Sequence, residues 1–320
     1  MAVYTDVSSR QLDVFLRDYE LGSVTELRGI ADGIENTNYF FSTERGSFIL
    51  TLFENSIRED LSYPFKLTRF LSERGIPCAR PIESRSAQVI GRLHEKPAVI
   101  VERLSGEIIE QPKISHLVIV GTMLARFHRL GLEFDETRCD LRNTTWLYEI
   151  ASIVRDRLSI SERNLLDTAI RRRRSFDKLR LPRGVIHSDL FRDNVLFAEN
   201  RLSGLIDFYD AHNGPLVYDL AVTVCDWCID ELGNLNTRAA ASMVQAYSRE
   251  RRLNVHEKQV WTESVRAAAL RFWLSRKKDQ LYTREGTLTQ SKDPDKFAVI
   301  LQASNNQPNT FHAPLESENE

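Results

Sequence analysis

Apolar residues in the first hundred positions gather in short runs separated by glycine and polar residues. Runs of this length, rich in branched and aromatic residues, are typical of β-strands in an antiparallel meander. Helical spacing occurs twice in the same part of the chain, at 12–19 after the capping residues Ser8 and Ser9, and between Asp60 and Glu73. The predicted strands are 24–30, 37–42, 48–53, 89–93 and 97–102.

After about residue 105 the apolar positions recur with the period of an α-helix. One small β patch interrupts them, at 185–186, 195–197 and 202–206. From Asn305 to the last residue no apolar periodicity remains, which predicts a mobile tail. The predicted helices are 114–128, 143–157, 161–179, 217–229, 237–250 and 256–281.

Strands early and helices late predict an α+β fold, because a doubly wound sheet would alternate the two throughout. We expect two lobes with a cleft between them: a small β-rich N-terminal lobe of residues 1–103 and a larger, mainly helical C-terminal lobe of residues 104–304. The remaining residues, 305–320, form the predicted tail.

Composition excludes several classes of function. With 43 basic and 45 acidic residues the net charge is −2, which gives no electrostatic case for nucleic acid or an anionic membrane as partner. No apolar run approaches the ~20 residues that span a bilayer, and the first residues do not resemble a secretory signal. Four cysteines make no disulfide framework, so a cytoplasmic enzyme is expected.

The chemistry is concentrated in His187-Ser-Asp-Leu-Phe-Arg-Asp-Asn194 and in the Asp207 that follows a short apolar strand. Phosphoryl transfer needs a carboxylate to orient the attacking hydroxyl and take its proton, and two oxygen ligands to hold Mg²⁺. Asp189 fits the first need, and Asn194 and Asp207 fit the second. His187 is expected to position this catalytic loop rather than to transfer a proton.

A turn-capping role for Asp189 and Asn194 would not explain why a second carboxylate follows at Asp207. The octapeptide fits the H-x-D-L-x-x-x-N loop of kinases, and Asp207-Phe208 fits the start of their D-F-G. Protein-kinase features are missing elsewhere, because Tyr209 replaces the glycine and neither A-P-E nor a G-x-G-x-x-G loop is present.

Residues 213–229 resemble instead the small-molecule kinases of the aminoglycoside phosphotransferase and choline kinase type. The resemblance covers about 29–276 and implies a bilobal protein-kinase-like fold, with ATP as donor, Mg²⁺ as cofactor and a small-molecule hydroxyl as acceptor. It also implies that Asp219 braces the catalytic loop.

Within that group the chain is most similar to the bacterial homoserine kinases of this fold. The resemblance implies phosphorylation of L-homoserine, a step towards threonine. The kinase assignment rests on residue roles, whereas the substrate rests on likeness alone. The segments that carry the likeness are 29–40, 48–54, 187–197, 205–209 and 271–276.

The phosphate site departs from the wider kinase pattern. Thr51 occupies the third-strand position where many relatives have lysine or arginine, which removes a positive charge. Backbone amides of the turn from Asp32, with the side chains of Asn36 and Asn38, could compensate, or these asparagines could only form the turn. The 99–104 segment, with Glu102 and Leu104, would offer backbone groups to adenine.

A free amino acid as acceptor calls for an arginine to bind its carboxylate and an acid to bind its ammonium. Arg271 and Arg276 are candidates for the first role, and both could instead be solvated or structurally paired. Tyr209, Asp210, Asp226 and Trp227 are further candidates for substrate contact, with packing or surface roles as the alternative.

The sequence also allows two other hypotheses about the function. One is a kinase for another hydroxylated metabolite, such as choline, an aminoglycoside or a sugar-amine. The other is a catalytically silent nucleotide-binding scaffold, which the absent third-strand lysine favours and the intact metal and base positions disfavour. The sequence leaves open whether the chain forms a homo-oligomer.

The sequence contains two further patterns that could suggest other chemistry. The C-x-x-C of Cys225 and Cys228 lacks a second pair and nearby histidines, so it is expected to lie on a half-buried helix face. The arginine run 171–174 lacks interleaved aromatic residues, which favours a solvated helix surface over a nucleic-acid site.

Overall fold

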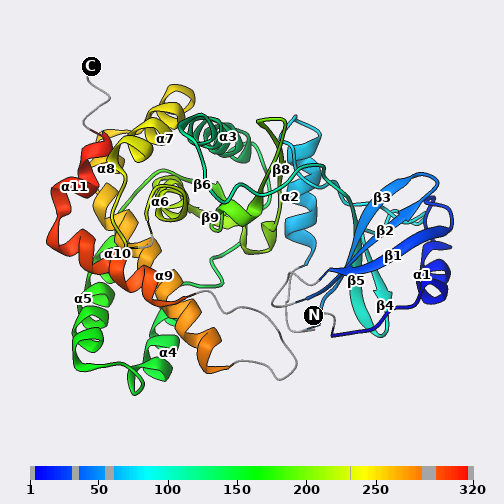
Figure 1. Ribbon diagram of the computed structural model, residues 1–320, viewed down its shortest axis with the longest axis horizontal. Helices are drawn as coiled ribbons and strands as arrows, with labels where there is room; N and C mark the ends of the chain where they lie inside the picture. Colours follow the sequence, from blue (N-terminus) through cyan, green and yellow to red (C-terminus); the bar gives the residue numbers. More distant parts are fainter. Residues whose placement is uncertain (1–3, 31–35, 55–60, 231, 283–292, 316–320) are drawn as a thin grey trace. The chain divides into compact units, whose positions relative to one another are not determined.

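The computed structural model describes residues 4–30, 36–54, 61–230, 232–282 and 293–315. These residues form two compact units that divide between Ser105 and Gly106, and residues 293–315 belong to the second unit (Figure 1). No helix in the described ranges has the length and apolar character needed to cross a membrane. The predicted α+β class with a β-rich first part and a helical second part is confirmed.

The first unit is built on a five-stranded antiparallel sheet with the strand order β1-β2-β3-β5-β4. Each strand lies within two residues of its predicted position, so the turns and alternating patterns were sufficient to find them. The bounds are β1 Val24–Ile30, β2 Thr37–Thr43, β3 Gly46–Leu52, β4 Ile90–Leu93 and β5 Lys96–Glu102.

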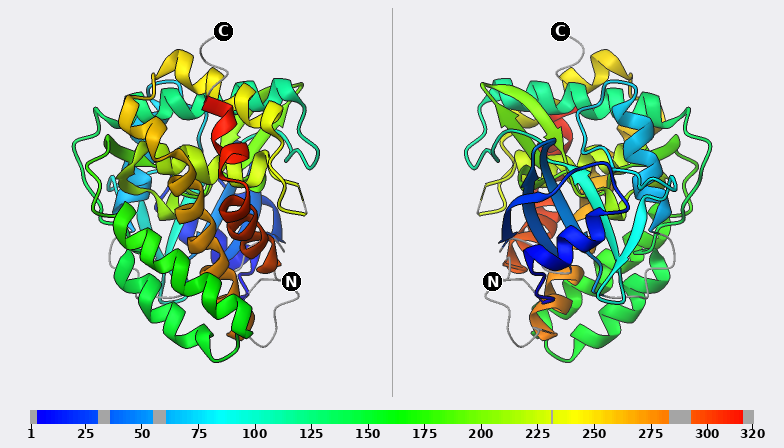
Figure 2. Two further views of the ribbon diagram at one scale, coloured as in Figure 1. Left: turned by 90° about the vertical axis from the view of Figure 1, so that its left-hand side faces the viewer. Right: turned by 90° about the vertical axis from the view of Figure 1, so that its right-hand side faces the viewer.

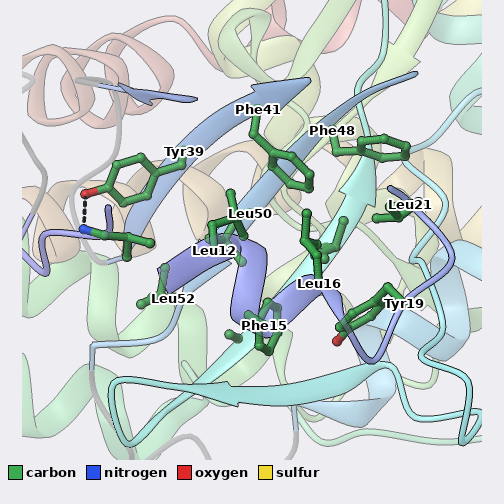
Figure 3. Close-up of a cluster of buried hydrophobic side chains, with 13 residues drawn as sticks. Leu12, Phe15, Leu16, Tyr19, Leu21, Tyr39, Phe41, Phe48, Leu50 and Leu52 are labelled. Atoms are coloured by element: carbon green, nitrogen blue, oxygen red, sulfur yellow. Dashed lines mark hydrogen bonds between the residues drawn. The ribbon is translucent and has the colours of Figure 1, made fainter. Parts of the chain in front are cut away.

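Helix α1 (Ser9–Leu16) covers one face of this sheet (Figure 3). Its N-terminus is closed by a capping box between Ser8 and Gln11, as the sequence indicates. Leu12 and Leu16 pack against Phe41 and Leu50 of the sheet in a cluster of buried side chains. Alternate residues of β2 and β3 therefore point towards α1, while Asn38 and Thr51 lie on the other face.

The first unit also contains helix α2 Ser62–Ser72, where the sequence predicts a helix between Asp60 and Glu73. The second unit contains helices α3 to α11 and two small antiparallel sheets, β6-β9 and β7-β8. Helix α9 packs beside α4, α5, α6 and α10, and Figure 2 shows it from two sides. The helices are α3 Ile114–Gly131, α4 Thr144–Arg155, α5 Ile160–Phe176, α6 Leu216–Trp227, α7 Thr237–Glu250, α8 Val255–Gln259, α9 Trp261–Leu281, α10 Asp295–Asn306 and α11 Pro308–His312. The strands are β6 Arg183–Ile186, β7 Val195–Ala198, β8 Arg201–Leu205 and β9 His212–Pro215.

One predicted helix is divided in the structure, and one strand was not predicted. The helix expected over 256–281 is two helices that meet at Val260, because Asn254 forms a capping box with Glu257 and starts a separate short helix. Strand β9 was not predicted, since Asn213-Gly214-Pro215 has turn composition. Its hydrogen bonds to β6 hold this segment as a strand, although the local sequence does not indicate one.

The expected mobile tail is wrong for residues 305–315. These residues form the end of α10, helix α11 and a final turn, and the Phe311 side chain is 1% exposed. The indole Nε1 of Trp261 donates to the Phe311 carbonyl at 2.8 Å. One buried aromatic residue and this hydrogen bond hold the segment against α9, although it lacks a repeating apolar pattern.

Replacing Phe311 with alanine is expected to lower the free energy of unfolding by about 3–5 kcal/mol, because it leaves a cavity beside Trp261. Chemical denaturation of the variant and the wild type measures this loss. Asn309→Ala is the control on the same helix, since Asn309 is exposed. A mobile segment would give the Phe311 variant wild-type stability.

Candidate active site

The catalytic loop, residues 187–194, links β6 to β7 in the second unit. Ser188 adopts a left-handed backbone conformation with φ of 64°, and residues 192–194 form a short 3₁₀ turn. A non-glycine residue at positive φ is uncommon and persists where surrounding contacts over-determine it. The contacts described below come from two helices, α6 and α9, and hold both halves of the loop.

Asn194 is oriented by Asp189. Its Nδ2 donates to the Asp189 carbonyl oxygen at 2.8 Å and lies 3.4 Å from the carboxylate oxygen Oδ2. Because the amide nitrogen faces Asp189, the side-chain oxygen Oδ1 points the other way. This assignment of the amide follows from its hydrogen bonds.

Asp207 reaches the same neighbourhood through the β7–β8 hairpin. The Ile206 N–H donates to the Asn194 carbonyl oxygen at 3.1 Å, one step beyond the pairing of Val195 with Leu205. Asp207 then turns the chain with a left-handed conformation, φ 63° and ψ 57°. Asn194 precedes the first strand of this hairpin and Asp207 follows its second strand, so both lie at the open end of the hairpin.

These oxygen-bearing side chains fit a hard cation such as Mg²⁺, which takes one or two carboxylates and completes its shell with phosphates and water. The parts of the chain that the structure describes contain no group of three or more histidine, cysteine, aspartate or glutamate residues that could hold a metal alone. A cation at Asn194 and Asp207 would therefore need ligands from a bound substrate.

Asp219 of α6 braces the first half of the loop from a fully buried position. Its carboxylate accepts the backbone N–H groups of His187 at 2.8 Å and Ser188 at 2.6 Å, and it contacts His128 Nε2 at 3.0 Å. Burial alone would raise the pKa of Asp219, but the hydrogen bond from His128, with the nearby charges and amides, holds that pKa below its usual value.

His187 is also fully buried, and its ring packs on Phe208 with the centroids 4.6 Å apart. Its Nε2 lies 3.0 Å from the carbonyl oxygen of Ile206, so the ring ties the loop to the residue before Asp207. Burial lowers the pKa of His187 despite the nearby Asp219 and Asp207 carboxylates, which favours the neutral form of the ring. The contacts favour a positioning role.

Arg271 of α9 lies behind the loop with 4% of its surface exposed. Its Nη1 donates to the Ser188 carbonyl oxygen, and its Nη2 lies 3.3 Å from Asp210 Oδ2. Arg142, which the sequence does not indicate as a site residue, also donates to the candidate Asp210. The guanidinium proposed for a substrate carboxylate is thus engaged in holding the loop.

The second half of the loop is held by the end of α6. Asp226 accepts the backbone N–H of Arg192 at 2.9 Å and its Nε at 3.1 Å. The indole of Trp227 donates to the Leu190 carbonyl oxygen at 3.0 Å. Burial raises the pKa of Asp226, but the positive charges of Arg192 and Lys296 outweigh this and keep the pKa low. Both predicted substrate residues therefore contact the loop itself.

Arg276 and Tyr209 complete the residues predicted for the acceptor. The Arg276 guanidinium lies 4.4 Å from the centre of the Phe297 ring, and its Nη1 donates to the Asp293 carbonyl oxygen at 3.0 Å. Tyr209 is half-buried, and its carbonyl oxygen accepts from Arg138 Nη1 at 2.6 Å. Arg276 is half-buried on the side of the loop that α10 covers.

The residues predicted for the nucleotide lie in the first unit, apart from Asp32, which is outside the described residues. Thr51 and Asn38 face each other across β2 and β3, and the Thr51 hydroxyl donates to Asn38 Oδ1 at 2.7 Å. Asn36 is half-buried, directly before β2. The Glu102 N–H donates to the Arg80 carbonyl oxygen at 2.9 Å, and Leu104 follows two residues later.

The cysteine pair and the arginine run lie elsewhere. Cys225 and Cys228 are buried free thiols whose pKa values are raised by burial, which disfavours redox chemistry. The expectation of a solvated arginine surface is wrong for Arg173, which is 9% exposed and lies 2.7 Å from Asp177. The neighbouring Arg172 pairs with Glu263 of α9.

Buried histidines make folding sensitive to acid. Burial lowers the pKa of His128, and it lowers the pKa of His212 from 6.5 to about 4, although Asp219 and Asp140 respectively oppose the shift. Below pH 6.5 the unfolded chain binds protons that the folded chain does not, so stability falls as the pH falls. His212 alone should account for about 3 kcal/mol between pH 6.5 and 4.

Denaturant unfolding at pH 7, 6 and 5 measures this slope. His212→Asn, which retains a donor for the Asp210 carbonyl oxygen, should flatten it. The same change at the exposed His256 is the control and should leave the slope as it is. An equal slope in the His212 variant and the wild type would show that His212 does not contribute.

Comparison with known proteins places this geometry in a family. The model of the phosphotransferase enzyme family (APH) matches residues 26–253. The chain is 41% identical over 304 residues to a homoserine kinase of Methylobacillus flagellatus, covering 95% of each chain. It is 42% identical over 314 residues to a homoserine kinase of Cupriavidus pinatubonensis, covering 94% of this chain and 95% of that protein.

Solved structures share the fold at low identity. A microcompartment-associated aminopropanol kinase is 16% identical with a TM-score of 0.72, over 96% of this chain and 99% of that chain. An amicoumacin kinase in complex with AMP-PNP and Ca²⁺ is 14% identical with a TM-score of 0.71, over 98% of this chain and 94% of that chain.

Proposed function

We propose, since this chain belongs to the phosphotransferase enzyme family, that it transfers the γ-phosphoryl group of ATP to the side-chain hydroxyl of L-homoserine. The product would be O-phospho-L-homoserine, in the synthesis of threonine. Relatives named homoserine kinase, at about 40% identity over nearly the whole chain, support the acceptor.

One observation carries the reaction type. Asn194 Nδ2 donates to the Asp189 carbonyl oxygen at 2.8 Å, and the Ile206 N–H donates to the Asn194 carbonyl oxygen at 3.1 Å. The Asp189 carboxylate and the side-chain oxygens of Asn194 and Asp207 therefore lie on one loop and the hairpin that follows it. This is the set of groups that phosphoryl transfer requires. Asp189 would orient the acceptor hydroxyl and take its proton at Oδ1 or Oδ2.

Asn194 Oδ1 and the Asp207 carboxylate would hold Mg²⁺ against the phosphates of ATP. When bound, the ion neutralises charge on the phosphates during transfer. The protein's own contribution is mainly positioning, because a loose transition state needs little covalent help. Asp219, Arg271 and Asp226 keep the loop in one conformation from three directions.

In the first unit, Asn38 and Thr51 would hydrogen-bond the phosphates in place of the missing lysine, with Asn36 beside them. The backbone of the segment containing Glu102 and Leu104 would contact adenine. Because the Glu102 N–H is already bonded to Arg80, its carbonyl oxygen is the group that could accept from adenine.

ATP consumption measured with L-homoserine, L-serine, choline and an aminoglycoside tests the proposal. We expect the highest kcat/KM for L-homoserine. A higher value for choline or the aminoglycoside would assign a different acceptor class, and ATP binding without turnover on any of them would favour a nucleotide-binding scaffold.

A further inference from the structure

Two positive side chains from different helices lie beside the second half of the catalytic loop. Lys296 of α10 places its Nζ 3.5 Å from Asp226 Oδ1. The guanidinium of Arg276, from α9, lies over the ring of Phe297, the next residue after Lys296. Lys296 has 19% of its side chain exposed and Arg276 is half-buried, so neither cation is fully enclosed by the protein.

Within the described ranges, Lys296 shares its carboxylate partner with a second cation. Asp226 is already bonded to the N–H and Nε of Arg192, at shorter distances than its contact with Lys296. Burial lowers the pKa of Arg276, and the carboxylates of Asp226, Asp189, Asp193 and Asp293 oppose the shift without cancelling it. A partly desolvated cation in this condition is stabilised by an added anion.

A row of packed aromatic rings connects Arg276 to the loop. Phe191 of the loop contacts Phe272 of α9 with centroids 4.5 Å apart, and Phe272 stacks on Phe297 of α10 at 5.2 Å. The flat face of Arg276 continues this stack. The position of Arg276 relative to Asp189 is therefore set by rigid packing rather than by a flexible side chain.

The short distance between the hydroxyl and the carboxylate of L-homoserine also bears on this site. Arg276 lies within electrostatic range of the Asp189 carboxylate. In L-homoserine the hydroxyl oxygen and the carboxylate carbon are separated by four bonds, about 5 Å when extended. A molecule with its hydroxyl at Asp189 therefore keeps its carboxylate within about 5 Å, in the region where the Arg276 charge interacts with Asp189.

We propose that Arg276 and Lys296 together bind the α-carboxylate of the acceptor and so select amino acids over amino alcohols. The proposal rests on the proposed function and adds Lys296, which the motif does not indicate. Arg271 is the less suitable arginine, since Ser188 and Asp210 already occupy it inside the protein. An arginine fork with a lysine beside it supplies the donors that a carboxylate accepts.

Arg276→Met and Lys296→Met remove the charges while keeping side chains that pack on Phe297 and α10. Each should raise the KM for L-homoserine about 10- to 100-fold, the effect of losing one hydrogen bond to a charged group. The inhibition constant of 3-amino-1-propanol, which has the hydroxyl and ammonium but no carboxylate, should not change. The KM for ATP should also stay as in the wild type.

Lys277→Met is the matched control. Lys277 follows Arg276 on α9, but its Nζ lies 2.9 Å from Asp295 and 3.3 Å from Glu162, away from the loop. This variant should keep the wild-type KM for L-homoserine. Thermal unfolding of all three variants shows whether each is folded, and Arg276→Lys should recover part of the affinity by restoring the charge.

The outcomes separate the two claims. If the wild type phosphorylates L-homoserine and both methionine variants keep its KM, the carboxylate site is wrong and the kinase function stands. A parallel loss of affinity for L-homoserine and 3-amino-1-propanol would also overturn it, because the cations would then not be reading the carboxylate. A wild type with no activity on L-homoserine would overturn the proposed function together with the site.

Discussion

Asp189→Asn is expected to lower kcat by about 10²- to 10⁴-fold, the usual contribution of a positioned general base. Asparagine has the same shape and can still contact Asn194, but it cannot take the proton of the acceptor hydroxyl. The affinity for ATP should remain near that of the wild type, since Asp189 is not proposed to touch the nucleotide. Steady-state kinetics and nucleotide titration measure the two quantities separately.

Asp193→Asn is the control for charge in the same loop, because it also removes one carboxylate between Phe191 and Asn194. Its kcat should be lower than that of the wild type by less than roughly ten-fold, well below the loss expected for a general base. If Asp189→Asn retains wild-type turnover, or if it unfolds at a much lower temperature, Asp189 is structural and not the base.

Asp207→Asn is expected to weaken the apparent affinity for Mg²⁺ by more than about 100-fold. Loss of a residue that only hydrogen-bonds a metal ligand already lowers metal affinity about 10- to 100-fold, and Asp207 is proposed as a ligand itself. Asparagine is the conservative choice, since it tolerates the left-handed backbone of this position better than alanine. Activity measured across a series of Mg²⁺ concentrations gives the shift.

The two variants should differ in kind. Loss of Asp189 should lower turnover at every Mg²⁺ concentration, whereas excess Mg²⁺ should partly restore the Asp207 variant. Equal thermal destabilisation of both, with no difference in Mg²⁺ dependence, would leave the proposed roles of Asp189 and Asp207 unsupported.

The strands and most helices could be predicted because their signals are local. Glycine and polar residues separate the runs that become β1 to β5, and Ser8 closes α1 with a capping box. Strand β9 and helix α11 were missed because their order depends on distant partners, β6 in one case and Trp261 in the other. Local composition contains no information about either contact.

The site residues also divide into those with local sequence signals and those whose roles depend on distant partners. Asp189, Asn194 and Asp207 stand in a motif whose spacing indicates their chemistry. His128 ends the apolar stripe of the predicted helix 114–128 and is buried in the structure. The roles of Arg271 and Asp226 could not be read from the sequence, because their partners lie 83 and 34 positions away. The buried positions Phe297, Ile300 and Leu301 had helical spacing that could have revealed α10 and, with it, Lys296.

Phosphorus NMR of the reaction with Mg·ATP and L-homoserine tests the central claim most directly. A phosphomonoester signal that is split into a triplet by the two hydrogens of the adjacent carbon is the predicted product in the wild type. That signal should be nearly absent with Asp189→Asn over the same time. ATP hydrolysis to inorganic phosphate alone, or an equal product signal from both proteins, would contradict the account.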